Sequence, residues 1–239
     1  MSTKWTLVTG GAKRLGASIC RRLAQEGHSI LIQYQNSLQE ANKTALECRQ
    51  YGIDAACIYG DFMTSSSTQQ FTEEVRRQFP NIQNLINNVG NYLQLSLENT
   101  STNDWEQLYQ INVHAPFACI HALLPSIKEH KGNIINIGTA GVLALHANGP
   151  APAYRATKTT LWMMTRLFAR ELAPYQVRVN MVSPGQLEIS EDAPGNLNTL
   201  PMQRLGSCDE VANVIAFLLA PENSYITGQD IEIAGALGL

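Results

Sequence analysis

Residues 9–16, Thr-Gly-Gly-Ala-Lys-Arg-Leu-Gly, join a short apolar run at 6–9 to an amphipathic segment at 15–27. Glycines in such a turn let the backbone bend sharply and bring N–H groups close to a phosphate. The N-terminus of the following helix adds a partial positive charge that favours an anion. This strand–turn–helix start predicts a pyrophosphate-binding turn, and Gly10 and Gly16 are its first candidates.

The same alternation of strand and helix continues along the whole chain. Apolar runs predict strands at 6–9, 29–34, 55–59, 82–87, 133–138, 177–182 and 231–233. Helical periodicity fills most of the intervals, at 15–27, 38–51, 67–79, 104–130, 153–172 and 208–219. Alternation of this kind predicts an α/β fold, namely a doubly wound, mostly parallel sheet with helices on both faces. We expect a single domain over residues 1–239.

Composition and charge exclude several classes of protein. The formal net charge is −3, from 17 basic and 20 acidic residues, and no basic run suggests nucleic acid as a partner. No run reaches the ~18 apolar residues that a membrane span requires. The 5 cysteines are scattered, which is typical of reduced thiols, and no secretory leader is evident, so we expect a cytoplasmic protein. The histidines form no metal-ligand grouping, and we expect no metal site.

The end of the second strand bears on the choice of dinucleotide. Gln35, Asn36 and Ser37 stand where an NAD site usually places a carboxylate for the ribose hydroxyls. A 2′-phosphate is repelled by a carboxylate and attracted by cations such as Lys13 and Arg14. The sequence therefore predicts NADPH or NADP⁺ rather than NAD.

Further candidate cofactor contacts follow the predicted strands at 55–59 and 82–87. Asp61, beside Phe62, is placed either to accept a hydrogen bond from an adenine amino group or to cap the next helix. The consecutive amides in Asn87-Asn88-Val89-Gly90 are placed to brace the end of the fourth strand beside the cofactor. The expected cofactor contacts are Gly10, Lys13, Arg14, Leu15, Gly16, Gln35, Asn36, Ser37, Asp61, Phe62, Asn88, Val89, Gly90, Tyr154, Lys158, Pro184 and Gly185.

Tyr154 and Lys158 are the candidate proton donor and its partner. Their spacing of four puts both side chains on one face of the predicted helix. A phenol has an ordinary pKa of ~10, and a nearby ammonium is expected to lower it toward neutrality. Such a pair suits donation of a proton to a carbonyl oxygen as hydride reaches the carbon.

Taken in order, these segments resemble the short-chain dehydrogenase/reductase family, with Asn112, Ser183-Pro184-Gly185 and Tyr225–Gln229 completing the pattern over nearly the whole chain. The resemblance implies a Rossmann-like fold, a nicotinamide cofactor and a catalytic set of asparagine, hydroxyl residue, tyrosine and lysine. It implies that Asn112 positions a water linked to Lys158, and that Lys158 also holds the nicotinamide ribose. It also implies a homodimer or homotetramer, built from the outer faces of 104–130 and 153–172.

Three residues depart from the family pattern. Arg14 replaces the middle glycine of the turn, as in NADPH-using reductases that resemble pteridine reductases. Thr139 aligns with the family serine after the fifth strand and keeps the hydroxyl that would polarise a substrate oxygen. Ile189 replaces a threonine near the carboxamide, where Ser190 is a possible substitute.

The substrate stays open between two small-molecule classes, a carbonyl or an imine. General similarity and the segment Arg204-Leu205-Gly206 favour a 3-oxoacyl thioester on a carrier protein. The first turn and Tyr92, an aromatic suited to stack on a pterin ring, favour a pteridine-reductase-like enzyme. A non-catalytic nucleotide-sensing relative is disfavoured, because Tyr154 and Lys158 are both present. The irregular segment 185–204 is expected to cover the substrate, and the candidate substrate contacts are Tyr92, His146 and Leu187.

Overall fold

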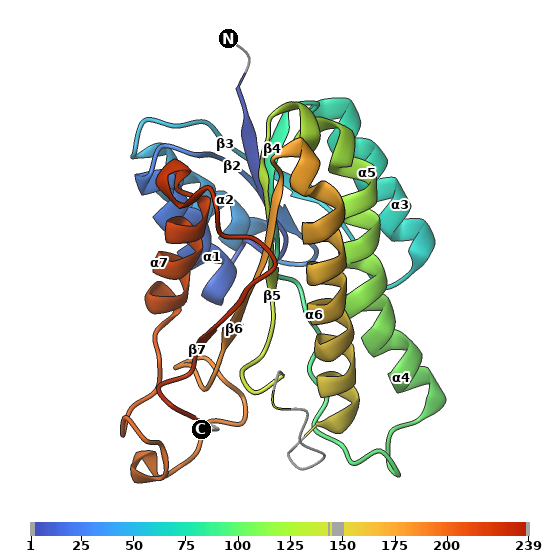
Figure 1. Ribbon diagram of the computed structural model, residues 1–239, viewed down its shortest axis with the longest axis vertical. Helices are drawn as coiled ribbons and strands as arrows, with labels where there is room; N and C mark the ends of the chain where they lie inside the picture. Colours follow the sequence, from blue (N-terminus) through green and yellow to red (C-terminus); the bar gives the residue numbers. More distant parts are fainter. Residues whose placement is uncertain (1–2, 143, 145–150, 238–239) are drawn as a thin grey trace.

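A computed structural model describes residues 3–142, 144 and 151–237. Its centre is one seven-stranded sheet in the order β3-β2-β1-β4-β5-β6-β7, in which each strand runs parallel to its neighbours (Figure 1). The expected doubly wound parallel sheet is confirmed. The strands are β1 (Trp5–Val8), β2 (Ser29–Tyr34), β3 (Ala55–Tyr59), β4 (Ile82–Asn87), β5 (Asn133–Ile137), β6 (Arg178–Pro184) and β7 (Asp230–Ile233).

Helices cover both faces of this sheet, with α1, α2 and α7 on one side and α3, α5 and α6 on the other (Figure 1). The helices are α1 (Arg14–Gln25), α2 (Leu38–Arg49), α3 (Ser65–Gln78), α4 (Thr102–Tyr109), α5 (Ala115–Glu129), α6 (Pro152–Leu172) and α7 (Cys208–Leu219). Among the helices that the structure describes, none combines the length and apolar character needed to cross a bilayer.

Each face of the sheet has its own apolar core. In β2, Ile30 and Ile32 pack toward α1, α2 and α7, whereas Leu31 between them packs toward the opposite layer. Successive side chains of a strand point to opposite faces, so a strand covered on both sides is apolar at most of its positions. This is why apolar residues predominate in the central strands, and why the buried polar residues within them, such as Asn84 and Asn136, have hydrogen-bond partners.

The prediction of a single helix at 104–130 is wrong in one respect. The chain runs from α4 through one wide π turn, η1 (Gln110–His114), into α5. Pro116 lies in the first turn of α5 and has no N–H to bond the carbonyl four residues earlier, at Asn112. The ladder of helical backbone hydrogen bonds is therefore interrupted at this point. The wide turn places Asn112 where the regular helix is broken.

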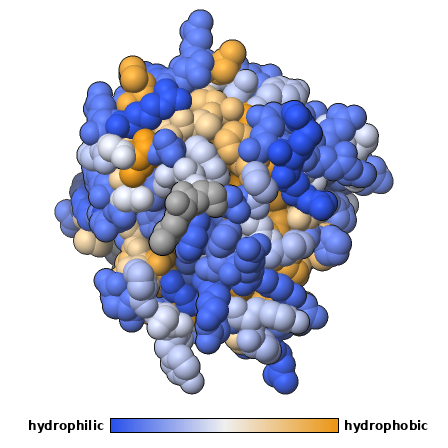
Figure 2. Space-filling model, turned by 90° about the horizontal axis from the view of Figure 1, so that it is seen from above, coloured by the Kyte–Doolittle hydropathy of each residue, from blue (hydrophilic) through white to orange (hydrophobic). Residues whose placement is uncertain are grey.

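The carboxyl ends of the parallel strands lie together at one edge of the sheet. Strand order reverses between β1 and β4, so the loops after these two strands diverge and leave a crevice for a ligand. The opposite end, where the chain begins, has a mainly hydrophilic surface with smaller apolar areas (Figure 2). Residues 185–204, after β6, are irregular apart from one short 3-10 turn, η3 (Leu197–Thr199), as expected.

Candidate active site

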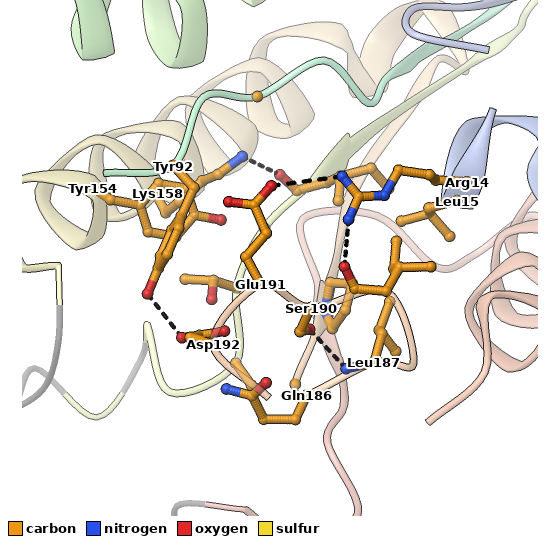
Figure 3. A pocket seen from close by; sticks show the side chains of 18 of the residues that line it. Arg14, Leu15, Tyr92, Tyr154, Lys158, Gln186, Leu187, Ser190, Glu191 and Asp192 are labelled. Atoms are coloured by element: carbon orange, nitrogen blue, oxygen red, sulfur yellow. Dashed lines mark hydrogen bonds and ion pairs between the residues drawn. The ribbon is translucent and has the colours of Figure 1, made fainter. Parts of the chain in front are cut away.

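A cavity of about 900 Å³ lies at the carboxyl ends of β1, β4, β5 and β6. It brings together segments that are far apart in the sequence (Figure 3). The expected site residues that line it are Gly10, Lys13, Arg14, Leu15, Gly16, Asn88, Val89, Gly90, Tyr92, Thr139, Tyr154, Lys158, Pro184, Gly185 and Leu187. His146 lies outside the described residues.

The glycine-rich turn after β1 is built as a tight cradle. Gly10 has φ +62°, a conformation that favours glycine. A Cβ at Gly16 would lie 2.0 Å from the carbonyl oxygen of Gly10, so only glycine fits there. The turn and the start of α1 therefore approach each other as closely as backbone allows, which leaves room for a phosphate at the helix N-terminus.

Gln33 holds this turn in place, and the sequence reasoning did not single it out. The Gly10 N–H donates to its Oε1 at 2.7 Å, and its Nε2 donates to the Gly60 carbonyl at 2.7 Å. Gln33 is buried in β2 and so links the ends of three adjacent strands. The available signal was an uncharged polar residue inside an apolar strand, which at a buried position requires partners.

The segment after β4 braces the turn from its other side. Thr9 Oγ1 accepts hydrogen bonds from the N–H groups of Asn88, at 2.9 Å, and Val89, at 3.1 Å. The Asn88 side-chain amide donates to the carbonyls of Thr9 and Gly10. Asn88 and Val89 thus occupy the bracing position that their sequence suggested.

A second, smaller hollow of about 250 Å³ adjoins the turn at the ends of β2 and β3. Its lining includes Lys13, Gln35, Asn36, Ser37, Asp61 and Phe62. Gln35 Nε2 donates to Asp61 Oδ1 at 2.8 Å. Asp61 does not cap the next helix, because Thr64 is the N-cap of α3 and forms its capping box. The carboxylate is therefore placed at the hollow rather than at a helix end.

We expected the side chain of Arg14 to face the same hollow as Lys13, but it points elsewhere. Its backbone is left-handed, with φ +54°, and its guanidinium donates to the Ile189 carbonyl at 2.5 Å. The same group lies 3.6 Å from a carboxylate oxygen of Glu191. The side chain leaves the turn toward the segment after β6, so Lys13 is the cation that lines the hollow beside Gln35–Ser37.

Tyr154 and Lys158 lie on α6 at the wall of the cavity. Lys158 is almost fully buried, its Nζ donates to the Ile137 carbonyl at 2.8 Å, and it lies 5.5 Å from the centre of the Tyr154 ring. Burial raises the pKa of Tyr154 to about 12 and lowers the pKa of Lys158 to about 8.

The expected lowering of the tyrosine pKa is therefore wrong for this structure. Both groups are withdrawn from water, and withdrawal disfavours the charged form of each one. Tyr154 keeps its proton at neutral pH, which is the form required of a proton donor.

Thr139 follows β5 and lines the same cavity as Tyr154, where its hydroxyl opposes the effect of burial on the tyrosine pKa. Its loop is fixed by two residues that the sequence did not suggest. The Gly141 N–H donates to Glu232 of β7 at 2.8 Å, and the Gly141 carbonyl accepts from Arg155 of α6 at 2.9 Å. The hydroxyl is thus presented beside Tyr154 by a loop held from two elements.

Replacing Thr139 by alanine is expected to lower kcat roughly 10²-fold, the usual effect of losing one donor to a developing oxyanion. Serine at this position keeps the hydroxyl and should restore most of the rate. Steady-state kinetics of the two variants provide the measurement. An alanine variant with wild-type kcat would place the polarising group elsewhere.

Asn112 is fully buried and has its hydrogen bonds satisfied within the protein. Its Oδ1 accepts from the Asn91 N–H at 2.7 Å, and its Nδ2 donates to the Asn91 carbonyl and to Thr157 Oγ1, each at 3.0 Å. The π turn thereby ties the loop after β4 to α6. Positioning of a water by Asn112 stays a prediction.

Tyr92 lies beside Tyr154, with ring centres 5.0 Å apart and ring planes at 81°. Its hydroxyl donates to Asp192 at 2.8 Å (Figure 3). On the opposite wall, Leu187 is buried and its N–H donates to Ser190 Oγ at 2.9 Å. This part of the cavity, around Tyr154, is therefore lined by aromatic, apolar and acidic groups.

Residues 4–194 match the family model described as short chain dehydrogenase. The chain belongs to this family. A short-chain dehydrogenase pattern thus accounts for the glycine-rich turn, the parallel sheet and the paired Tyr154 and Lys158 observed here.

Similar short-chain dehydrogenases include a 3-oxoacyl-[acyl-carrier-protein] reductase of Staphylococcus aureus (strain N315), 30% identical, with 98% of each chain covered. A blue fluorescent protein from a metagenomic library, solved in complex with NADPH, superposes with a TM-score of 0.90 at 30% identity, covering 99% of this chain and 98% of the other. An acetoin dehydrogenase from Enterobacter cloacae gives a TM-score of 0.89 at 28% identity, covering 98% and 95%. These likenesses support an oxidoreductase acting on CH–OH or C=O groups.

Proposed function

We propose that this short-chain dehydrogenase is an NADPH-dependent reductase in which Tyr154 protonates a substrate carbonyl oxygen. The observation that carries the proposal is the meeting of Tyr154, Thr139 and Lys158 in one cavity beside the glycine-rich turn. The close approach at Gly10 and Gly16 forms a cradle that a Cβ would fill, so the residues fit a dinucleotide. Lys13, beside Gln35–Ser37, supports a 2′-phosphate.

Each side chain has a separate task in this mechanism. A reduced nicotinamide, when bound, supplies the hydride. Thr139 O–H polarises the carbonyl oxygen, and Tyr154 O–H transfers its proton to that oxygen as negative charge develops on it. Lys158 contributes positive charge beneath the tyrosine, which stabilises the phenolate left behind.

We infer that the substrate is a 3-oxoacyl thioester, whose 3-oxo carbonyl this chemistry would reduce to an alcohol. The inference draws on the relatives that act on acyl-carrier-bound substrates, such as the Staphylococcus aureus enzyme. A dihydropterin is the second candidate, because the aromatic ring of Tyr92 and the carboxylate of Asp192 face the same cavity. An aromatic ring can pack on a pterin, and a carboxylate can accept its N–H groups.

The assembly and location proposed for the protein follow the family resemblance. We propose a homodimer or homotetramer in the cytoplasm, formed through the outer faces of α5 and α6. Exposed apolar side chains on these helices, including Phe117 and Leu167, support such a contact.

NADPH is expected to be used at least tenfold better than NADH, measured as kcat/KM with acetoacetyl thioester and with a dihydropterin. Replacing Lys13 by glutamine should raise the KM for NADPH about tenfold or more, because a charge-assisted hydrogen bond contributes about 1.5–3 kcal/mol. The KM for NADH should hardly change. Lys4→Gln, at an exposed position before β1, is the matched control. A tenfold preference for NADH would contradict the cofactor assignment, and turnover of neither substrate would contradict the proposed function.

A further inference from the structure

Residues 189–192, which we term the strap, connect two walls of the cavity (Figure 3). Its first residue, Ile189, is bound through its carbonyl by Arg14 from the glycine-rich turn. Its last residue, Asp192, is bound through its carboxylate by Tyr92 from the loop after β4. The strap therefore has one attachment on the cofactor side and one on the side of the proton donor.

Asp192 is connected to the proton donor, Tyr154, through one side chain, the ring of Tyr92. Tyr92 O–H donates to Asp192 at 2.8 Å, and the Tyr92 ring stands nearly perpendicular to the Tyr154 ring with centres 5.0 Å apart. Burial and the neighbouring carboxylate raise the pKa of Tyr92, so its hydroxyl keeps its proton and remains a donor. Within the part of the chain that the structure describes, Asp192 forms no ion pair, and Tyr92 is its hydrogen-bonding partner.

The attachment at Arg14 fixes the other end of the strap. The guanidinium holds both the Ile189 carbonyl and, at 3.6 Å, the Glu191 carboxylate. Within the strap, Ser190 Oγ accepts from the Leu187 N–H, which closes the turn leading into it. With its first residues held this way, Asp192 is presented to Tyr92 from a supported backbone.

We propose that Tyr92 and Asp192 form a positioning pair for the reaction, in which the Asp192 carboxylate holds the Tyr92 ring against Tyr154 and so fixes the orientation of the proton donor. The proposal rests on the proposed function, because it requires Tyr154 to donate the proton. If the Tyr92 ring could rotate freely beside Tyr154, the Tyr154 hydroxyl could turn away from the substrate oxygen to which it donates its proton. Misplacement of a reacting group by about 1 Å can cost about 10²-fold in rate.

The test is a double-mutant cycle on Tyr92→Phe and Asp192→Ala. Phenylalanine keeps the ring and removes the hydrogen bond, and alanine removes the same bond from the other side. Each variant is expected to lower kcat about tenfold with less than a twofold change in KM. The double variant should be no worse than either single one, because both remove one shared interaction. Asp192→Asn retains an acceptor oxygen and should restore most of kcat.

Two controls separate positioning from a general effect on the fold. Tyr51→Phe makes the same chemical change at a hydroxyl bonded to Gln25 outside the cavity, and should leave kcat unchanged. Thermal unfolding of every variant should stay within about 2 °C of the wild type. The positioning proposal would be overturned if the losses in kcat of the two single variants multiplied in the double variant. It would also be overturned if the substitutions changed only KM. Absence of NADPH oxidation by the wild type with any carbonyl or imine tested would instead refute the reductase on which the pair depends.

Discussion

Replacing Tyr154 by phenylalanine is expected to lower kcat roughly 10³-fold, within the range usual for loss of a general acid. The ring remains and keeps its packing against Tyr92, so the change removes little besides the hydroxyl group that carries the proton. Because burial holds the pKa of Tyr154 near 12, the wild-type residue is protonated throughout the neutral range and is ready to donate. Single-turnover reduction with saturating NADPH measures the effect directly.

Binding of NADPH is the matched control for this variant. Tyr154 belongs to α6 rather than to the glycine-rich turn, so the dissociation constant should change less than threefold. Nucleotide fluorescence on binding provides that measurement. A variant that binds NADPH normally and still turns over within tenfold of the wild type would show that another group delivers the proton.

Replacing Gly16 by alanine is expected to abolish useful binding of NADPH, with a dissociation constant raised roughly 100-fold. The new methyl would lie 2.0 Å from the Gly10 carbonyl oxygen, which is backbone and cannot rotate away. The turn must open, and the N–H groups that face a phosphate lose charge-assisted hydrogen bonds of about 1.5–3 kcal/mol each. Overpacking of this kind should also cost roughly 3 kcal/mol of unfolding free energy.

Gly27→Ala provides the matched control for the turn. Gly27 also has a positive φ, +83°, but apart from its own residue and its chain neighbours no atom lies within 4 Å of an added Cβ. That variant should lose about 1 kcal/mol of stability through backbone strain and bind NADPH normally. Denaturant unfolding combined with titration of the nucleotide distinguishes the two variants. Normal NADPH binding by Gly16→Ala would show that the turn tolerates the shift and does not cradle the phosphate.

The sheet could be predicted from the sequence because its strands are buried on both faces. Such strands are mostly apolar on both faces, as Ile30, Leu31 and Ile32 are, and an apolar run between helical segments is a strong signal. The spacing of Tyr154 and Lys158 likewise placed both on one helix face. These features depend on local periodicity, which a single sequence displays directly.

Features that depend on tertiary contacts were predicted less well. The direction of Arg14 depends on where Ile189 and Glu191 lie, and these residues are 175 and 177 positions further along the chain. The break in the helix at Gln110–His114 needed the combined effect of Pro116 and the buried partners of Asn112. The pKa of Tyr154 depends on its burial, which spacing alone does not reveal.

The fixing of the Thr139 loop has a consequence for the order in which this site can form during synthesis. Glu232, which holds the loop through Gly141, belongs to β7, the last strand to emerge from the ribosome. The glycine-rich turn is complete once β4 has paired beside β1, whereas the Thr139 loop gains its second support only when β7 docks on β6. A nascent chain thus braces the glycine-rich turn well before the Thr139 loop, and a chain that ends before residue 230 would lack the support that Glu232 gives to this loop.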